Sequence, residues 1–211
     1  MTSATNKFPL RSLAHFGFLT LPGFSMIAFT SAVEVLRMAN YVDCAQHYRW
    51  SILTPDGVPV RASNGITLKP ACTLDEAGRP DVLIVCGGTQ IRSAVDSRVR
   101  ELLRVVALQG VPLGGMCTGA YALMSVGLLD HYRCTVDWED LFMLSKEFPR
   151  VHFVDELFVI DRDRLTCAGG TAPLELMLNL VGSRLGQNVA AQVSFELKSF
   201  GQMPQVKSRM T

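Results

Sequence analysis

The chain alternates short apolar runs with longer segments whose apolar residues recur at helical spacing. Residues 14–21 (AHFGFLTL) form one apolar run, and residues 81–86 (DVLIVC) form another that stops at two glycines. A continuous apolar run of this length indicates a strand that is covered on both faces, as in a parallel sheet. Residues 25–42 between them keep helical spacing and begin at Ser25, a residue type suited to cap a helix.

The rest of the chain continues this alternation. The pattern predicts strands at 48–54, 111–116, 132–136, 151–154, 157–160 and 165–168, and a hairpin of 58–62 with 66–68. It predicts helices at 93–109, from 118 onward, at 138–147, 171–185 and 186–200. Strands that alternate with helices are typical of an α/β domain with a mostly parallel sheet and helices on both faces. Such sheets bind ligands past the carboxyl ends of their strands.

Composition narrows the function. With 20 basic and 19 acidic side chains the formal charge is +1, whereas a unit that grips DNA phosphates usually has a clear basic excess. This chain alone is therefore not expected to bind DNA. Six irregularly spaced cysteines predict free thiols, and four scattered histidines predict no metal and no cofactor. The first residues lack an apolar leader, and no run approaches the roughly 18 apolar residues of a membrane span, so we expect a cytoplasmic protein.

The sharpest chemical feature is Gly115-Met116-Cys117-Thr118-Gly119, at a predicted strand-to-helix junction. This is a GxCxG form of the nucleophile elbow, a tight turn that projects its central side chain above the sheet. Cys117 at a helix N-terminus is expected to favour the thiolate. The alternative is a buried structural cysteine in a tight turn.

Two other features are candidates for the same site. Gly87 and Gly88 end a predicted central strand, and their amides are candidates for half of an oxyanion or carboxylate pocket; the alternative is an ordinary glycine turn. Gly169-Gly170-Thr171 is a candidate for the rim of that pocket or for a helix cap. Glu34 lies in an apolar helix, where composition alone favours an exposed side chain.

Four segments together resemble a known family: FGFLTLPGFSMIAFTSAVEVLRMAN, PDVLIVCGG, GGMCTGAYALMSVGLLD and CAGGTAPLELMLNLV. They resemble the ThiJ/PfpI (class I glutamine amidotransferase-like) domain of AraC-type transcription regulators, in pattern those of glycine betaine, carnitine and arginine catabolism. The resemblance implies a flavodoxin-like, three-layer α/β/α fold that binds an effector and forms a homodimer. It implies that Cys117 is the elbow cysteine and that Glu34 is the acid set against it. It also implies a C-terminal helix-turn-helix region that binds DNA.

The chain departs from the family at the position of the general base. Asp137 stands where many relatives have histidine, and Thr118 stands where hydrolytic members often place one. Cys117 therefore has no evident base, and an acid near the pocket favours a cationic ligand such as a quaternary ammonium or guanidinium compound. The aromatic side chains expected to assist by cation–π contact are Phe24, Tyr121 and Trp138.

These observations predict a ligand sensor rather than an enzyme. Its expected ligand residues are Cys117, Thr118, Glu34, Gly87, Gly88, Asp137 and Trp138. The expected organisation is a flexible N-terminus (1–13), the effector-binding domain (14–200), and a tail or linker (201–211) to a DNA-binding domain absent from this chain. The alternative is a cysteine-dependent enzyme similar to isonitrile hydratases, which resemble this chain at the elbow but carry an aspartate that residues 28–34 lack. A third reading is reversible oxidation of Cys117.

Overall fold

A six-stranded sheet forms the centre of the molecule, in a computed structural model that describes residues 10–198, apart from the side chains at 74, 75 and 198. The sheet order is β2 (Arg49–Leu53), β1 (His15–Thr20), β5 (Val82–Cys86), β6 (Leu113–Met116), β10 (Arg164–Cys167) and β9 (Phe158–Asp161). Every neighbouring pair is parallel except β10 and β9, which is antiparallel. The predicted mostly parallel sheet is confirmed.

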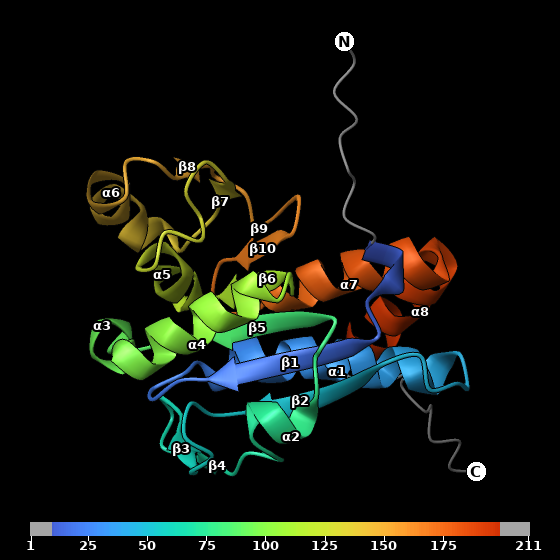
Figure 1. Ribbon diagram of the computed structural model, residues 1–211. Coiled ribbons are helices and arrows are strands. Elements are labelled where there is room, and N and C mark those ends of the chain that lie inside the picture. Colours follow the sequence, from blue (N-terminus) through green and yellow to red (C-terminus); the bar gives the residue numbers. More distant parts are fainter. Residues whose placement is uncertain (1–9, 199–211) are drawn as a thin grey trace, which may run out of the picture.

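Helices cover both faces of this sheet (Figure 1). The helices α1 (Met26–Val42), α7 (Ala172–Leu185) and α8 (Gln187–Lys198) pack together on one face. The helices α4 (Ser97–Leu108) and α5 (Gly119–Met124) pack on the other. Consecutive side chains of a strand point to opposite faces, so Phe18 enters the first core and Leu19 the second. The predicted three-layer α/β/α architecture is confirmed.

The remaining elements are mostly short and lie outside the six-stranded sheet. They are the 3₁₀ helix η1 (Leu10–Ser12), the paired strands β3 (Val60–Arg61) and β4 (Thr67–Leu68), the helices α2 (Leu74–Ala77), α3 (Ile91–Ala94) and α6 (Trp138–Glu147), and the paired strands β7 (Arg133–Cys134) and β8 (His152–Phe153). Figure 1 shows β7, β8 and α6 together at the upper left, beyond α5. None of the described helices is long and apolar enough to cross a membrane.

The predicted helix at 93–109 is present as α4 over 97–108, but it does not extend to residue 93, because the structure divides this segment into α3 and α4. Asp96 separates them: its side chain accepts a hydrogen bond of 2.9 Å from the amide of Val99 and so caps α4. An N-cap residue has extended rather than helical backbone geometry, so it interrupts a helix even where the apolar spacing continues. The spacing of the apolar residues continues across Asp96, so it does not predict this break.

The chain termini fall largely outside the described residues. The predicted tail at 201–211 lies wholly outside them, as do residues 1–9 of the predicted flexible N-terminus. Within that predicted N-terminus, residues 10–12 form η1, which packs on α7, and Leu13 is buried.

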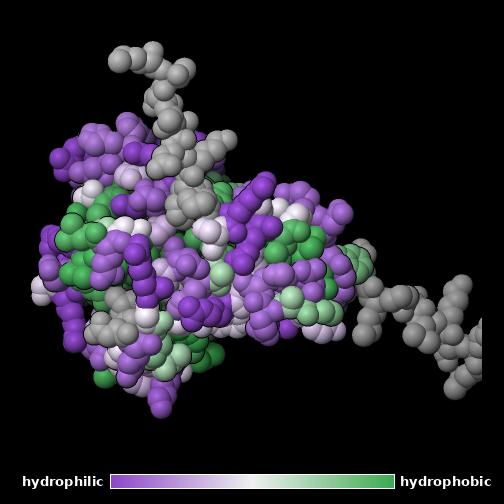
Figure 2. All heavy atoms as spheres, turned by 45° about the vertical axis from the view of Figure 1, so that its right-hand side comes forward, coloured by the Kyte–Doolittle hydropathy of each residue, from purple (hydrophilic) through white to green (hydrophobic). Residues whose placement is uncertain are grey.

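The outer surface is mixed. On the face drawn in Figure 2, hydrophobic side chains lie in patches separated by hydrophilic ones. The largest exposed apolar side chains of α6 are Trp138, Phe142 and Met143. More than half of the accessible surface of a typical folded protein is apolar, so this distribution alone assigns no function.

A tight backbone contact joins α5 to β5. A Cβ atom added to Gly119 would lie 2.1 Å from the carbonyl oxygen of Val85. Because the obstacle is backbone in a central strand, no side-chain rearrangement relieves it. Glycine at position 119 is therefore what allows α5 to start directly against the sheet.

We expect Gly119→Ala to destabilise the domain by about 3 kcal/mol or more, because the added methyl group overpacks backbone against backbone. Thermal unfolding would show this as a fall of roughly 6 to 12 °C in midpoint. Gly78→Ala is the matched control: Gly78 has a φ of +66° but no atom within 4 Å of an added Cβ. It should cost only about 1 kcal/mol of backbone strain. Equal midpoints for the two variants would contradict the packing argument.

Candidate functional site

The turn between β6 and α5 places Cys117 at the carboxyl end of the sheet. Cys117 has a φ of +54°, a conformation that non-glycine residues seldom adopt and that costs about 1 to 2 kcal/mol. Its amide donates a 3.2 Å hydrogen bond to the carbonyl oxygen of Cys167, which ties the turn to the end of β10. Strained residues that persist in this way cluster at functional sites. The predicted elbow geometry is present, with the side chain partly buried.

Asp137 is the polar partner of Cys117. The Cys117 thiol donates to Asp137 Oδ2 at 3.6 Å, and the amide of Gly169 donates to Asp137 Oδ1 at 2.8 Å. A Cβ on Gly169 would lie 3.1 Å from the Cys117 sulfur and 2.9 Å from Asp137 Oδ2, so glycine is what lets the three groups meet. Asp137 also directly precedes α6. One carboxylate therefore joins the elbow, the loop after β10 and the start of α6.

The environment keeps Cys117 protonated. Burial, followed by the negative charge of Asp137, raises the pKa of Cys117 to about 11, and the amide of Thr118 opposes this only in part. The expected thiolate is therefore wrong. α5 has only six residues, and its favourable end effect is smaller than the cost of burying a second negative charge beside a carboxylate.

The predicted glycine pocket is only partly open. The Gly87 amide donates to the carbonyl oxygen of Met116 at 3.2 Å, so it is already used within the backbone and does not face an oxyanion. Thr118 Oγ1 donates to the Gly88 carbonyl oxygen at 2.7 Å. Thr118 and Gly88 thus brace one another next to the elbow.

Within the part of the chain that the structure describes, three predicted site residues form no hydrogen bond or ion pair with Cys117. The carboxylate of Glu34 pairs with Arg37 Nη2 at 2.7 Å on the outer side of α1, and its side chain is 45% exposed. The structure brings Asp137, not Glu34, to the thiol, so the expected pairing of Glu34 with Cys117 is wrong. Trp138 is 79% exposed, and Phe24 is fully buried against Phe29.

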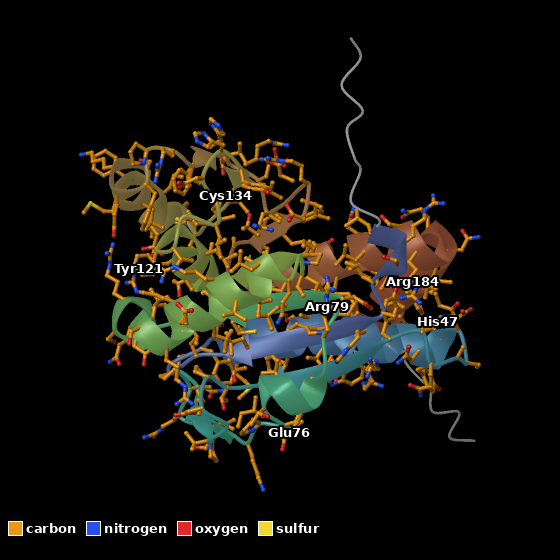
Figure 3. The ribbon with its side chains drawn as sticks, viewed as in Figure 1. His47, Glu76, Arg79, Tyr121, Cys134 and Arg184 are labelled. Atoms are coloured by element: carbon orange, nitrogen blue, oxygen red, sulfur yellow. The ribbon has the colours of Figure 1, made fainter. Side chains whose placement is uncertain are left out.

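A small cavity of about 210 Å³ lies next to the elbow, between α3, α5 and α6. Its walls include Thr118 and Gly88 from the predicted set, and Tyr121 from the aromatic candidates; Figure 3 labels Tyr121 at this side of the molecule. Gln90, Arg92 and Asp140 also line it, and sequence reasoning missed all three. Asp140 lies three residues after Asp137, a spacing that puts two side chains on one side of a helix and was the available signal.

A larger groove of about 510 Å³ lies elsewhere, between α4 and the loop after β2. It shares no residue with the elbow. Among the described residues there is also no group of three or more His, Cys, Asp or Glu side chains arranged to hold a metal ion. The six cysteines are free thiols. The small cavity beside Cys117 is therefore the candidate site.

This fold and elbow define a class of protein, and the chain belongs to the DJ-1/PfpI family, whose model matches residues 16–183. Over 178 residues it is 45% identical to the HTH-type transcriptional regulator GbdR of Pseudomonas aeruginosa, a match that covers 84% of this chain and 48% of that protein. It is 43% identical to the regulator CdhR of the same species, covering 85% of this chain and 53% of the relative. The chain thus spans about half the length of these relatives.

A solved structure and an enzyme complete the comparison. The crystal structure of an AraC family transcriptional regulator from Pseudomonas putida matches with a TM-score of 0.79 and 33% identity, covering 88% of this chain and all of that one. An isonitrile hydratase of Pseudomonas putida is 30% identical over 185 residues, covering 86% of this chain and 77% of the enzyme. The predicted resemblance to regulators is confirmed, and the enzyme is a more distant relative.

We expect Cys117 to be alkylated slowly at neutral pH. With a pKa of about 11, only a very small fraction of the thiol is ionised at that pH, and the thiolate is the form that reacts. Asp137→Asn keeps an oxygen for the Gly169 amide but removes the neighbouring negative charge. It should lower the pKa of Cys117 and raise the neutral-pH rate about tenfold. Iodoacetamide labelling followed by peptide mass spectrometry measures this at Cys117 separately from exposed Cys44.

Asp140→Asn is the control for that measurement. Asp140 contributes least among the groups that raise the pKa of Cys117, so its neutralisation should change the rate much less. A labelling rate that is fast at pH 7 in the parent protein, or equal effects of both substitutions, would contradict the assignment of Asp137 as the controlling charge.

Proposed function

We propose that this chain is the effector-sensing domain of an AraC-type transcription regulator, which binds a small cationic metabolite in the cavity beside Cys117. Its relatives of 45% and 43% identity are transcriptional regulators that extend well beyond the matched region. In this proposal DNA binding belongs to another part of the whole protein, in keeping with the near-neutral charge of this chain. Homodimerisation and a cytoplasmic location follow from the same resemblance.

The observation that carries the proposal is the pairing of Cys117 with a carboxylate. A cysteine nucleophile needs a base or a lowered pKa to attack a substrate. Here the thiol is the donor in its bond to Asp137, and its pKa is raised. Neither Thr118 nor Asp137 supplies an imidazole. The elbow therefore supports binding better than acyl transfer, and the raised pKa also argues against ready oxidation of Cys117.

The chemistry of the cavity favours a cation as ligand. Asp140 and the ring of Tyr121 line it, together with Thr118, the residue that follows Cys117. Carboxylates attract positive charge, and an aromatic face binds a cation through its quadrupole. A quaternary ammonium or guanidinium compound combines both requirements. Glu34, Gly87 and Trp138 remain predictions as ligand residues.

The second candidate function is an isonitrile hydratase-like enzyme. The 30% identity to such an enzyme favours it, since that match covers 77% of the enzyme. Against it, residues 28–34 contain no aspartate of the kind that those enzymes carry in this segment, and Ala28 is buried there. The two functions differ in whether the ligand survives contact with the protein.

We expect an effector from a panel of betaines, carnitine, arginine and other amino acids to raise the thermal unfolding midpoint of the chain. A ligand at 100 times its dissociation constant adds about 2.7 kcal/mol to the free energy of unfolding. For a domain of this size that is a shift of roughly 5 to 10 °C. Cys117→Ala should keep most of the shift, because the thiol is not required as a nucleophile.

Isonitriles in the same panel separate the alternatives. Chromatography of each sample after incubation reports whether the ligand is recovered intact. Consumption of an isonitrile by the parent protein but not by Cys117→Ala would overturn the sensor and establish the enzyme. A saturable shift with intact ligand supports the sensor and gives its effector class.

A further inference from the structure

Arg92 places a guanidinium group of the protein's own at the mouth of the candidate cavity. It belongs to α3, and its Cζ lies 4.8 Å from the centroid of the Tyr121 ring. Its Nη1 also approaches the Tyr121 hydroxyl at 3.4 Å. Arg92 therefore occupies one face of the only aromatic ring that lines this cavity among the described residues.

A second contact holds Arg92 in this position. Nη1 and Nη2 donate to the two carboxylate oxygens of Glu147 at 2.9 and 2.5 Å, a two-pronged pair. Glu147 is the last residue of α6, so the pair links α3 to the far end of the helix that Asp137 precedes. The Arg92 side chain is 57% exposed, and the pair is thus open to exchange with solvent.

The cavity holds an unmatched negative charge at the same time. No ion pair or side-chain hydrogen bond reaches the carboxylate of Asp140 from any part of residues 10–198 that the structure describes. Phe148 packs against the Tyr121 ring at a centroid distance of 5.8 Å and an angle of 76°, which fixes the ring in place. The cavity thus combines an aromatic ring packed against Phe148, a carboxylate without an ion pair and a half-exposed internal cation.

We propose that Arg92 is an internal competitor of the cationic ligand. This rests on the proposed function, since it concerns ligand binding at the same cavity. An incoming cation takes the ring face of Tyr121 and the charge of Asp140, and Arg92 moves away from the ring. Its pair with Glu147 then breaks or shifts, which releases the end of α6 from α3. Ligand binding is in this way coupled to the position of α6.

Two charges cannot share one ring face, so removing the internal cation should strengthen binding of the external one. We choose choline as probe, because its trimethylammonium group is a minimal quaternary cation, and dimethylbutanol as its neutral carbon isostere. Arg92→Gln should bind choline about threefold to tenfold more tightly than the parent chain, as measured by isothermal titration calorimetry. The neutral isostere should show no such gain.

The chain offers a matched control and a second variant. Arg133 pairs with Glu156 and is 50% exposed, but it lies outside the cavity, so Arg133→Gln should leave choline affinity unchanged. Arg92→Lys retains the charge and should bind choline with nearly the parent affinity. This variant keeps the test decisive if Arg92→Gln unfolds, because a large gain in Arg92→Lys would contradict competition between charges.

The outcomes separate this inference from the proposed function. Choline binding that is equal or weaker in Arg92→Gln overturns the competition but leaves a cation-binding sensor standing. Tighter binding in Arg92→Gln, together with no midpoint shift of the parent chain by any member of the effector panel, supports the competition and removes the proposed effector class. If choline binds to neither protein, the competition at this ring is overturned, and the effector panel decides the proposed function separately.

Discussion

The close approach of α5 to β5 is the constraint on which the site depends. Gly119 rests against the carbonyl oxygen of Val85, which brings the start of α5 directly onto the sheet. The chain must therefore turn within Cys117 and Thr118, and Cys117 takes up a left-handed backbone conformation. The three-layer packing supplies the stability that offsets this strain, since the elbow lies between two extensive cores.

Electrostatics then decide what this turn is able to do. An imidazole beside an elbow cysteine accepts its proton and activates the sulfur as a nucleophile. Beside a carboxylate, the same cysteine keeps its proton and donates a hydrogen bond. Here Asp137 accepts from both the thiol and the Gly169 amide, which orients it firmly toward Cys117. The negative charge of Asp137 disfavours the thiolate, and a second carboxylate, that of Asp140, lines the cavity and favours a cation there.

The sequence predicted the frame of the molecule because buried strands and amphipathic helices leave periodic patterns. The central strands, the helix at 26–42, the hairpin and the elbow all follow from such local signals. The break at Asp96 and the placement of Glu34 do not, because each depends on a hydrogen bond or ion pair formed in the fold. Arg92 and Asp140 were also missed, since they come from helices that are far apart in the chain and meet only when α3 and α6 pack around Tyr121. Composition predicts an exposed Glu34, which agrees with its half-exposed side chain, whereas the family resemblance implies a Glu34 that faces Cys117.

The residue at position 137 bears on how easily this domain and an enzyme could arise from one another. The codons for aspartate and histidine differ by a single base, and histidine is the residue that an acyl-transfer enzyme would place at this position. The strained turn at Cys117 lies in the backbone and would survive such a replacement. The amide of Gly169 would lose its acceptor, because it donates to the carboxylate of Asp137. A binding domain and a catalyst built on this scaffold are thus neighbours in sequence space, separated at this position by one point mutation.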